Sequence, residues 1–185
     1  TTLFRSIDDA TGTMNDLEMS VGTAKPLTLN AFTKAGYGFD KWTTNPDGTG
    51  TVYDDGETVN NLALTGTVTL YARWKKLTTA TFITGSELNS KMSSLAGSLN
   101  NILRVKYVSN LTEENKASGT VVSVSTQSDE PIYMWWDESS KTMYYASDAD
   151  VLYLNETCSY MFNNLTNVKE IDTHFDTSKC TNMIS

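Results

Sequence analysis

The sequence contains no apolar run that approaches the roughly 20 residues needed for a membrane-spanning helix. It also lacks the glycine-rich GxxxxGK[ST] and GxGxxG motifs with which proteins hold nucleotide phosphates. These two absences argue against insertion of this segment into a membrane and against a nucleotide site. We therefore expect no membrane insertion in this fragment and no cofactor.

Basic charge is scarce as well. The chain has 14 Lys and Arg against 22 Asp and Glu, a net charge of −8, and its densest basic run is Lys75 and Lys76. Binding to a phosphate backbone or an anionic membrane needs concentrated positive charge, so nucleic acid is not an expected partner. With 39% hydrophobic and 19% charged residues, the composition is that of a folded chain and not of a disordered tail.

Cysteine is limited to Cys158 and Cys180, which lack the CxxC spacing of zinc sites. No metal ion is expected there. The sequence leaves two states open for this pair, a disulfide and two buried free thiols. We favour the free thiols, because a disulfide depends on a geometry that the spacing does not define.

The pattern changes near Lys76, and we expect two domains, residues 1–76 and 77–185, each with a modest core. Thr1 is not an initiator residue and no signal peptide is recognisable, so we expect a piece of a longer protein. The expected fold class is α+β, mainly β.

Residues 35–74 combine aromatic residues with turn residues and end in an alternating strand. In that strand Val68, Leu70, Ala72 and Trp74 alternate with Thr67, Thr69, Tyr71 and Arg73. A period of two predicts that one face of the strand is buried. Trp42 and Trp74 each carry enough apolar area to anchor a small core, so we assign these aromatics to the core.

An ordered series of motifs extends over about residues 3–75. It consists of Gly12, Thr13 and Met14, the turn at Gly22, Leu27, GYGFDKW (36–42), DGTGTVYDDG (47–56) and TVTLYARW (67–74). The series resembles the Listeria/Bacteroides repeat, also called the internalin B-repeat. The resemblance implies a small β-grasp-like fold that bacterial cell-surface proteins use as a spacer or interaction unit.

Residues 85–108 predict a helix and then a strand. Leu88, Met92 and Leu95 follow the helical period, with Ser86 as the expected N-cap and Gly97 just beyond the end. Residues 102–108 alternate as in a strand with one polar-tipped face.

Two aromatic strands, residues 131–137 and 142–147, are joined by a polar turn and predict a β-hairpin, which a third strand at 151–154 follows. Alternation places one Trp and one Tyr of the hairpin on each face. An exposed aromatic pair can stack on a sugar ring or a partner protein. The candidate ligand-binding residues are Trp135, Trp136, Tyr144 and Tyr145. The alternative, which we favour, is that a helix or a neighbouring module covers this face.

The C-terminal residues are spaced as in a helix, turn and strand unit that cannot bury its apolar face alone. The apolar positions are Met161, Phe162, Leu165, Val168, Ile171 and Phe175. Together, IYMWWD (132–137), DADVLYLN (148–155), SYMFNNLTNVKEID (159–172) and FDTSKCTNM (175–183) resemble the BspA-like leucine-rich repeat surface proteins. The resemblance implies a mixed α/β cap over about 85–155 that leads into a truncated leucine-rich-repeat-type unit from Ser159.

No catalytic residues are expected. His174, the one histidine, has no nucleophile-elbow glycines beside it and shares a local segment with Cys180, unlike assembled Cys/His sites. The carboxylates at 54, 55 and 57 lack the alternating oxygens of calcium loops, and we assign them to solvated turns.

We therefore expect a non-catalytic, extracellular fragment of a bacterial cell-surface protein, used for adhesion or protein interaction, with the B-repeat as a spacer. Its partner would be a host or neighbouring-cell surface protein or a glycan. The alternative is a glycan-binding module that uses exposed aromatics of the 131–146 hairpin. The oligomeric state and the identity of the ligand stay open.

Overall fold

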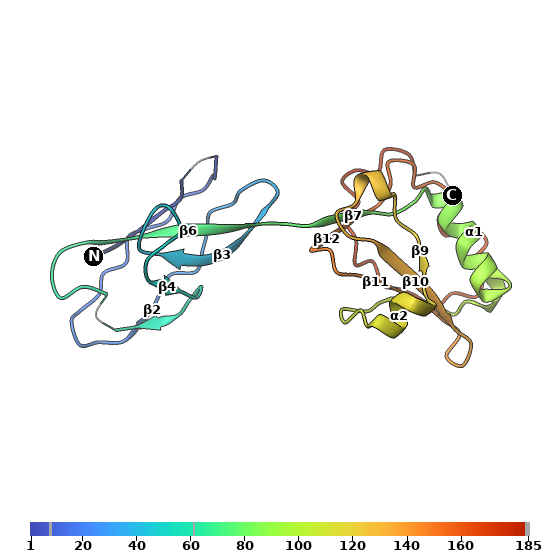
Figure 1. Ribbon diagram of the computed structural model, residues 1–185, viewed down its shortest axis with the longest axis horizontal. Helices are drawn as coiled ribbons and strands as arrows, with labels where there is room; N and C mark the ends of the chain where they lie inside the picture. The colour runs from blue at the N-terminus through green and yellow to red at the C-terminus, as the bar shows by residue number, and fades with distance from the viewer. Residues whose placement is uncertain (8, 61, 184–185) are drawn as a thin grey trace. The chain divides into compact units, whose positions relative to one another are not determined.

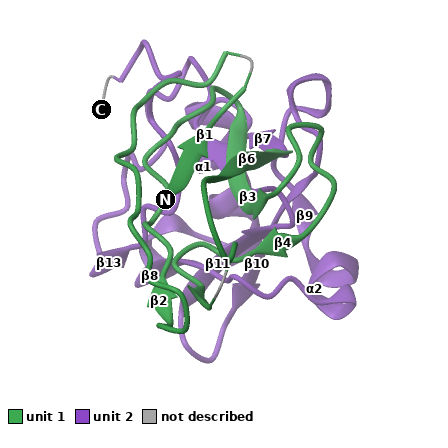
Figure 2. Ribbon diagram, turned by 90° about the vertical axis from the view of Figure 1, so that its left-hand side faces the viewer, with its two compact units in different colours: residues 1–77 green, residues 78–185 purple. Residues whose placement is uncertain are grey.

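The computed structural model describes residues 1–7, 9–60 and 62–183 (Figure 1). The chain forms two compact units, Thr1–Leu77 and Thr78–Ser185, which Figure 2 shows in different colours. Strands far outnumber helices, so the predicted α+β, mainly β class is confirmed. Each unit is described by itself.

Unit 1 is built from strands over its described residues. They are β1 (Thr2–Arg5), β2 (Lys25–Pro26), β3 (Tyr37–Thr43), β4 (Val52–Tyr53), β5 (Thr58–Val59) and β6 (Val68–Lys76). The main sheet has the order β1-β6-β3-β4, and β2 pairs with β5. β1 and β6 are parallel, whereas β3 is antiparallel to both β6 and β4. The first and last strands of the unit are therefore neighbours.

Trp42 lies at the centre of the unit 1 core and is 0% exposed. Its ring centroid is 4.8 Å from that of Phe4 and 5.0 Å from that of Phe39, and its indole N–H donates to Asp55 Oδ1 at 3.3 Å. The other buried apolar residues of this core are Leu27, Phe32, Val59, Leu70 and Ala72. In β6 the buried side chains all lie on one of the two alternating faces, as the period of two predicts.

Unit 2 contains seven strands and four short helical segments within its described residues. The strands are β7 (Thr79–Thr81), β8 (Arg104–Tyr107), β9 (Thr120–Val121), β10 (Ile132–Asp137), β11 (Thr142–Ser147), β12 (Val151–Tyr153) and β13 (Glu170–Ile171). The helices are α1 (Gly85–Ala96) and α2 (Glu113–Ser118), with 3₁₀ turns η1 (Leu99–Asn101) and η2 (Ser125–Gln127). One sheet has the order β13-β8-β11-β10-β9, and β7 and β12 form a separate parallel pair.

Helix α1 begins after Thr84, and the assignment of Ser86 as its N-cap is wrong. The Thr84 hydroxyl accepts a hydrogen bond from the Glu87 N–H, and the Glu87 carboxylate accepts one from the Thr84 N–H at 3.1 Å. This reciprocal capping box satisfies two backbone donors and defines the helix start. Gly97, at φ 71°, ends the helix as predicted.

Residues 159–164 and 166–167 form turns, where a helix was predicted. Tyr160 and Asn164 have φ values of 62° and 60°, in the left-handed region that a right-handed helix excludes. Met161 and Leu165 are nevertheless buried. The spacing therefore identified core residues but not the backbone that carries them.

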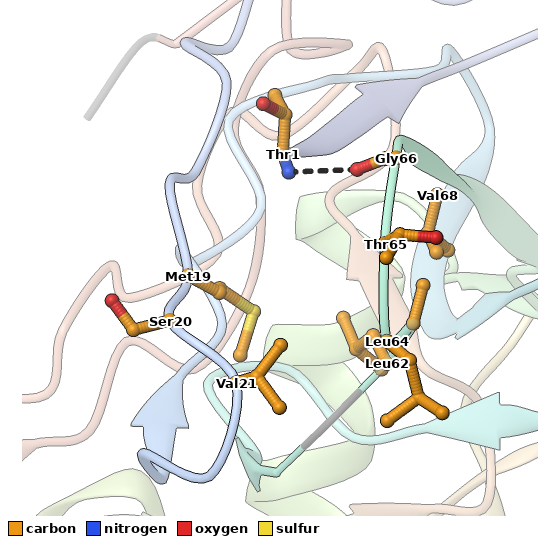
Figure 3. Close-up of a pocket in the computed structure, with 10 residues that line it drawn as sticks. Thr1, Met19, Ser20, Val21, Leu62, Leu64, Thr65, Gly66 and Val68 are labelled. Carbon is orange, nitrogen blue, oxygen red and sulfur yellow. Dashed lines mark hydrogen bonds between the residues drawn. The ribbon is translucent and has the colours of Figure 1, made fainter.

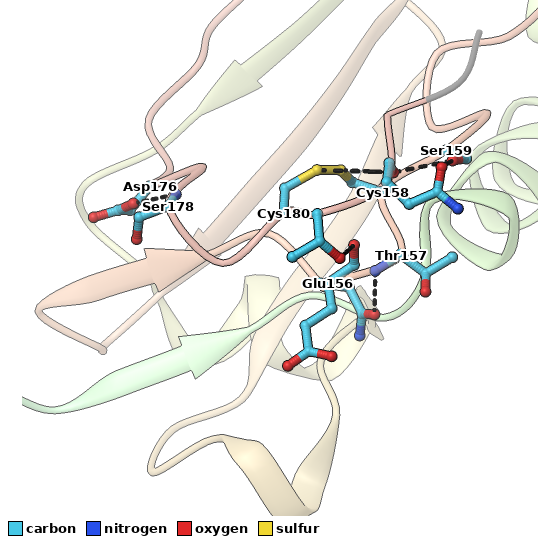
Figure 4. The surroundings of a disulfide bond; sticks show 10 residues. Glu156, Thr157, Cys158, Ser159, Asp176, Ser178 and Cys180 are labelled. Carbon is cyan, nitrogen blue, oxygen red and sulfur yellow. Dashed lines mark hydrogen bonds between the residues drawn. A yellow bond between two sulfur atoms is a disulfide. The ribbon is translucent and has the colours of Figure 1, made fainter.

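A disulfide joins Cys158 and Cys180 (Figure 4), so our preference for free thiols is wrong. Their Cα atoms are 6.0 Å apart, within the usual range for a disulfide. The segments that carry the two cysteines run parallel, with a β-bridge between Thr157 and Asn182. The disulfide therefore closes a loop between two segments that already lie side by side.

Trp42→Ala is expected to destabilise unit 1 by about 3–5 kcal/mol, because it removes the largest fully buried side chain and leaves a cavity. Denaturant titration followed by NMR reports each unit separately. We expect the signals of residues 1–77 to be lost earlier and those of residues 78–185 to keep their midpoint.

Trp136→Ala is the matched control, since Trp136 packs against the core of unit 2. It is expected to lower only the unit 2 midpoint. One shared transition that shifts as a whole in both variants would show that the two units do not fold independently.

Candidate functional site

The β10–β11 hairpin positions the predicted aromatic residues. Trp135 lies opposite Tyr144, and Trp136 lies opposite Met143, in an antiparallel register. At the turn, the Asp137 carboxylate accepts hydrogen bonds from the Ser139 hydroxyl at 2.7 Å and from the Ser139 N–H at 2.9 Å. These bonds and one from the Ser140 hydroxyl hold the pKa of Asp137 below its ordinary value. The turn is therefore anchored by its own side chains.

Tyr145 and Trp136 are on the core side of the hairpin. Tyr145 is 1% exposed, and its hydroxyl donates to the Asp172 carbonyl at 2.9 Å. Burial raises the pKa of this hydroxyl well above its ordinary range. Trp136 packs against the same core, and its indole N–H donates to Glu138 Oε2 at 2.8 Å. The structure thus removes Tyr145 from the candidate ligand-binding residues and gives Trp136 a structural role.

Trp135 and Tyr144 lie on the opposite side of the sheet, where both are half-buried. Their rings are stacked, with centroids 5.8 Å apart and planes at 24°. Within the described part of the chain, no side chain or backbone group hydrogen-bonds to the Trp135 indole N–H or the Tyr144 hydroxyl. Two of the four predicted residues therefore form one aromatic pair with free polar groups.

Charged residues of β8 and β13 continue this side of the sheet. In the sheet register, Lys106 lies beside Tyr144, and Arg104 lies beside both Thr142 and Glu170. Lys106 Nζ is 2.8 Å from a Glu170 carboxylate oxygen, and Arg104 Nε is 3.8 Å from the other. We call the set Tyr133, Trp135, Tyr144, Arg104, Lys106 and Glu170 the outer aromatic face. It carries two positive charges and one negative charge in a chain of net charge −8.

The other groups considered for chemistry are engaged in structural contacts. His174 stacks on Tyr107 at a centroid distance of 3.8 Å, and Cys180 has no thiol because it is in the disulfide. Asp54 pairs with Lys41, and Asp55 Oδ1 accepts from the Asn30 N–H at 2.9 Å as well as from an indole. Among residues 1–7, 9–60 and 62–183, no three His, Cys, Asp or Glu side chains are arranged to hold a metal ion.

A small hollow of about 220 Å³ opens in unit 1 (Figure 3). The lining includes Met19, Val21, Leu62 and Leu64, and the Thr1 ammonium donates to the Gly66 carbonyl at 3.2 Å. Its volume is below the roughly 300–1,000 Å³ of ordinary ligand pockets, and its side chains bring no charged group. Its lining mixes these apolar side chains with Ser20, Thr65 and the Thr1 ammonium.

Comparison with known families identifies part of unit 1. Residues 6–73 match the family model of the Listeria-Bacteroides repeat domain. The predicted resemblance is thus confirmed for that repeat domain, and such repeats occur in bacterial surface proteins. No curated protein and no solved structure matches the chain. No helix in the described ranges is both long and apolar enough to cross a membrane.

Outside the repeat domain, sequence reasoning missed Arg104, Lys106 and Glu170 as members of the outer aromatic face. The alternation of residues 102–108 does place Arg104 and Lys106 on one side of a strand. The alternation does not say which strands lie next to that strand in the sheet. Its neighbours are β11 and β13, which pair with β8 in parallel although they are far from it in the chain.

The pKa of Glu138 is expected to depend on its two side-chain hydrogen bonds. The bond from Lys141 and, second, the one from the Trp136 indole lower the pKa of Glu138. In Trp136→Phe we expect this pKa to rise towards its ordinary value, and in Lys141→Met to rise further. Because the pKa of Glu138 is lower in the folded state, these bonds stabilise the fold at pH values above the ordinary Glu range. This stabilisation is lost as the pH falls through the folded pKa.

Carboxyl NMR titration measures both variants. Asp137 is the internal control, since its lowered pKa depends first on Ser139 and should stay the same in Trp136→Phe. An unchanged Glu138 pKa in Trp136→Phe would contradict the indole contact.

Proposed function

We propose that the chain is a non-catalytic part of a bacterial cell-surface protein that serves adhesion or protein interaction, with unit 1 as a spacer. The observation that carries the proposal is the match of residues 6–73 to the Listeria-Bacteroides repeat domain. The disulfide supports an extracellular location, because disulfides persist in oxidising compartments outside the cytoplasm. The partner would be a surface protein or glycan of a host or neighbouring cell.

For unit 1 the proposed fold is β-grasp-like. Its support is the parallel pairing of the first and last strands, β1 and β6, in one mixed sheet with β3 and β4. A β-bridge between Thr2 and Leu17 adds an antiparallel neighbour to β1. This places the first and last strands of the unit side by side within the sheet.

For unit 2 we propose a cap that leads into a BspA-like leucine-rich-repeat-type unit. Its support is two isolated parallel bridges, one between Tyr153 and Asp176 and one between Thr157 and Asn182. The chain thus returns beside itself after one interval, within the roughly 20–29 residues of a leucine-rich repeat. β7, which pairs in parallel with β12, would belong to the cap.

The proposal that the chain is not an enzyme rests on the engagement of its reactive groups. The histidine is stacked on a tyrosine, and the cysteines are bonded to each other. A catalytic site would need convergent polar groups in a pocket.

Cell-surface location is tested with antibodies raised against residues 78–185. We expect them to label intact bacteria that produce the parent protein, and we expect protease treatment of intact cells to remove the label. An antibody against a cytoplasmic enzyme controls for cell integrity. Labelling that appears only after the cells are made permeable would contradict the proposal.

Glycan binding is a second candidate function, favoured by the stacked Trp135–Tyr144 pair. Aromatic rings with free polar edges, flanked by Lys106 and Glu170, suit the apolar faces and hydroxyls of a sugar. The outer aromatic face, and not the whole hairpin, would form the site.

A glycan array followed by titration tests this candidate. For any glycan that binds, we expect Trp135→Ala and Tyr144→Ala to weaken binding by about tenfold or more. Trp136→Phe is the matched control and should bind like the unmodified chain, because Trp136 points to the core. An array without binding, or equal losses in all three variants, would remove the candidate.

A further inference from the structure

Both units pair their first strand in parallel with a later strand of the same unit, β1 with β6 and β7 with β12. In unit 1, β1 pairs with β6 over four residue pairs, from Thr2 with Val68 to Arg5 with Tyr71, and the pairing is parallel. Tension on the two ends therefore pulls β1 backwards and β6 forwards. Two neighbouring parallel strands are then loaded in opposite directions along their length.

This geometry is shear, and in it the applied force is shared among the hydrogen bonds of the ladder. In a parallel ladder the hydrogen bonds are evenly spaced, so sliding stretches all of them together, whereas peeling breaks them one at a time. The bond from Val68 N–H to the Thr1 carbonyl, 3.0 Å long, extends the ladder. Phe4 and Leu70 are paired across it and are 1% and 0% exposed. Sliding the strands would also displace these core side chains from their register.

In unit 2 the first strand, β7, is parallel to β12. The ladder begins with polar contacts: the Thr78 N–H donates to Asp150 Oδ2 at 2.9 Å, and the Asp150 N–H donates to the Thr78 hydroxyl at 3.1 Å. It ends with a bond of 2.9 Å from the Phe82 N–H to the Tyr153 carbonyl. The first strand of this unit is thus held along its length by β12.

The disulfide connects β12 to the later part of the chain. After β12 the chain reaches Cys158, which is bonded to Cys180 (Figure 4). A pull applied beyond Cys180 passes through the two sulfurs to Cys158 and then to β12, and it bypasses residues 159–179. β12 is then pulled forwards while β7 is pulled backwards, which is again shear.

We propose that the chain is a force-bearing connector in which both units are loaded in shear and the Cys158–Cys180 disulfide carries tension past residues 159–179. The function goes beyond surface display or ligand binding, since neither requires resistance to tension. It also does not depend on the identity of any ligand.

Single-molecule force spectroscopy of the full chain tests unit 1 by changing only the points of attachment. Handles at residues 1 and 76 load β1 against β6. Handles at residues 37 and 76, which are partners at the open end of the β3–β6 antiparallel ladder, peel that ladder instead. At one loading rate we expect the first geometry to unfold at a clearly higher force, since forced unfolding follows the unfolding barrier. Equal or lower force in the first geometry would overturn the proposal for unit 1.

The disulfide is tested in unit 2 with handles at residue 76 and at the C-terminal residue. Replacing both cysteines, Cys158→Ser with Cys180→Ser, should lower the first unfolding force and add about 70 Å to the released length. A second geometry, with handles at residues 76 and 156, bypasses the disulfide in both proteins. There we expect the replacement to leave the force unchanged. An equal fall in force in both geometries would show general destabilisation and overturn the load-carrying role.

Discussion

The parallel pairing between an early and a late strand is the constraint on which each unit depends. Parallel neighbours cannot be joined by a tight turn, so the residues between β1 and β6, and those between β7 and β12, must form a long crossover connection. Trp42 is buried only when both β1 and β6 are in place, because Phe4 and Leu70 complete its surroundings. Structures dominated by such distant contacts fold slowly.

Alternation and turn chemistry allowed much of the strand content to be predicted from the sequence. The buried residues of β6 and the β10–β11 hairpin follow from a period of two, which is a local property. The choice between the two faces of that hairpin is not local. Tyr145 is the buried tyrosine because Phe82, from a distant segment, packs against its side of the sheet. Only the assembled sheet distinguishes it from Tyr144.

Three local interpretations failed for physical reasons that can be identified. Thr84 displaced Ser86 as the N-cap because Glu87 stands three residues after it and completes a capping box. The predicted helix after Ser159 is interrupted by residues at positive φ. The disulfide joins two segments that an isolated parallel bridge between Thr157 and Asn182 brings together, and the linear spacing of the cysteines does not reveal that proximity. The first failure was avoidable from the sequence, whereas the other two required tertiary structure.

Aromatic residues serve two different purposes in the chain. Trp42 and Tyr145 are enclosed, and their polar atoms are satisfied internally by Asp55 and by a backbone carbonyl. Trp135 and Tyr144 are stacked on the opposite side of the hairpin from Tyr145, where both are half-buried. The same residue types therefore fill the two cores and also form a stacked, half-buried pair outside them.

The β1–β6 pair also imposes an order of events on a chain that is made from its N-terminus. β1 is synthesised first, but its sheet neighbour is complete only when Tyr71, the partner of Arg5, has been added. Until then the first strand has no parallel partner and the core around Trp42 cannot close. Unit 1 can thus complete its main sheet only when almost all of its residues have been synthesised.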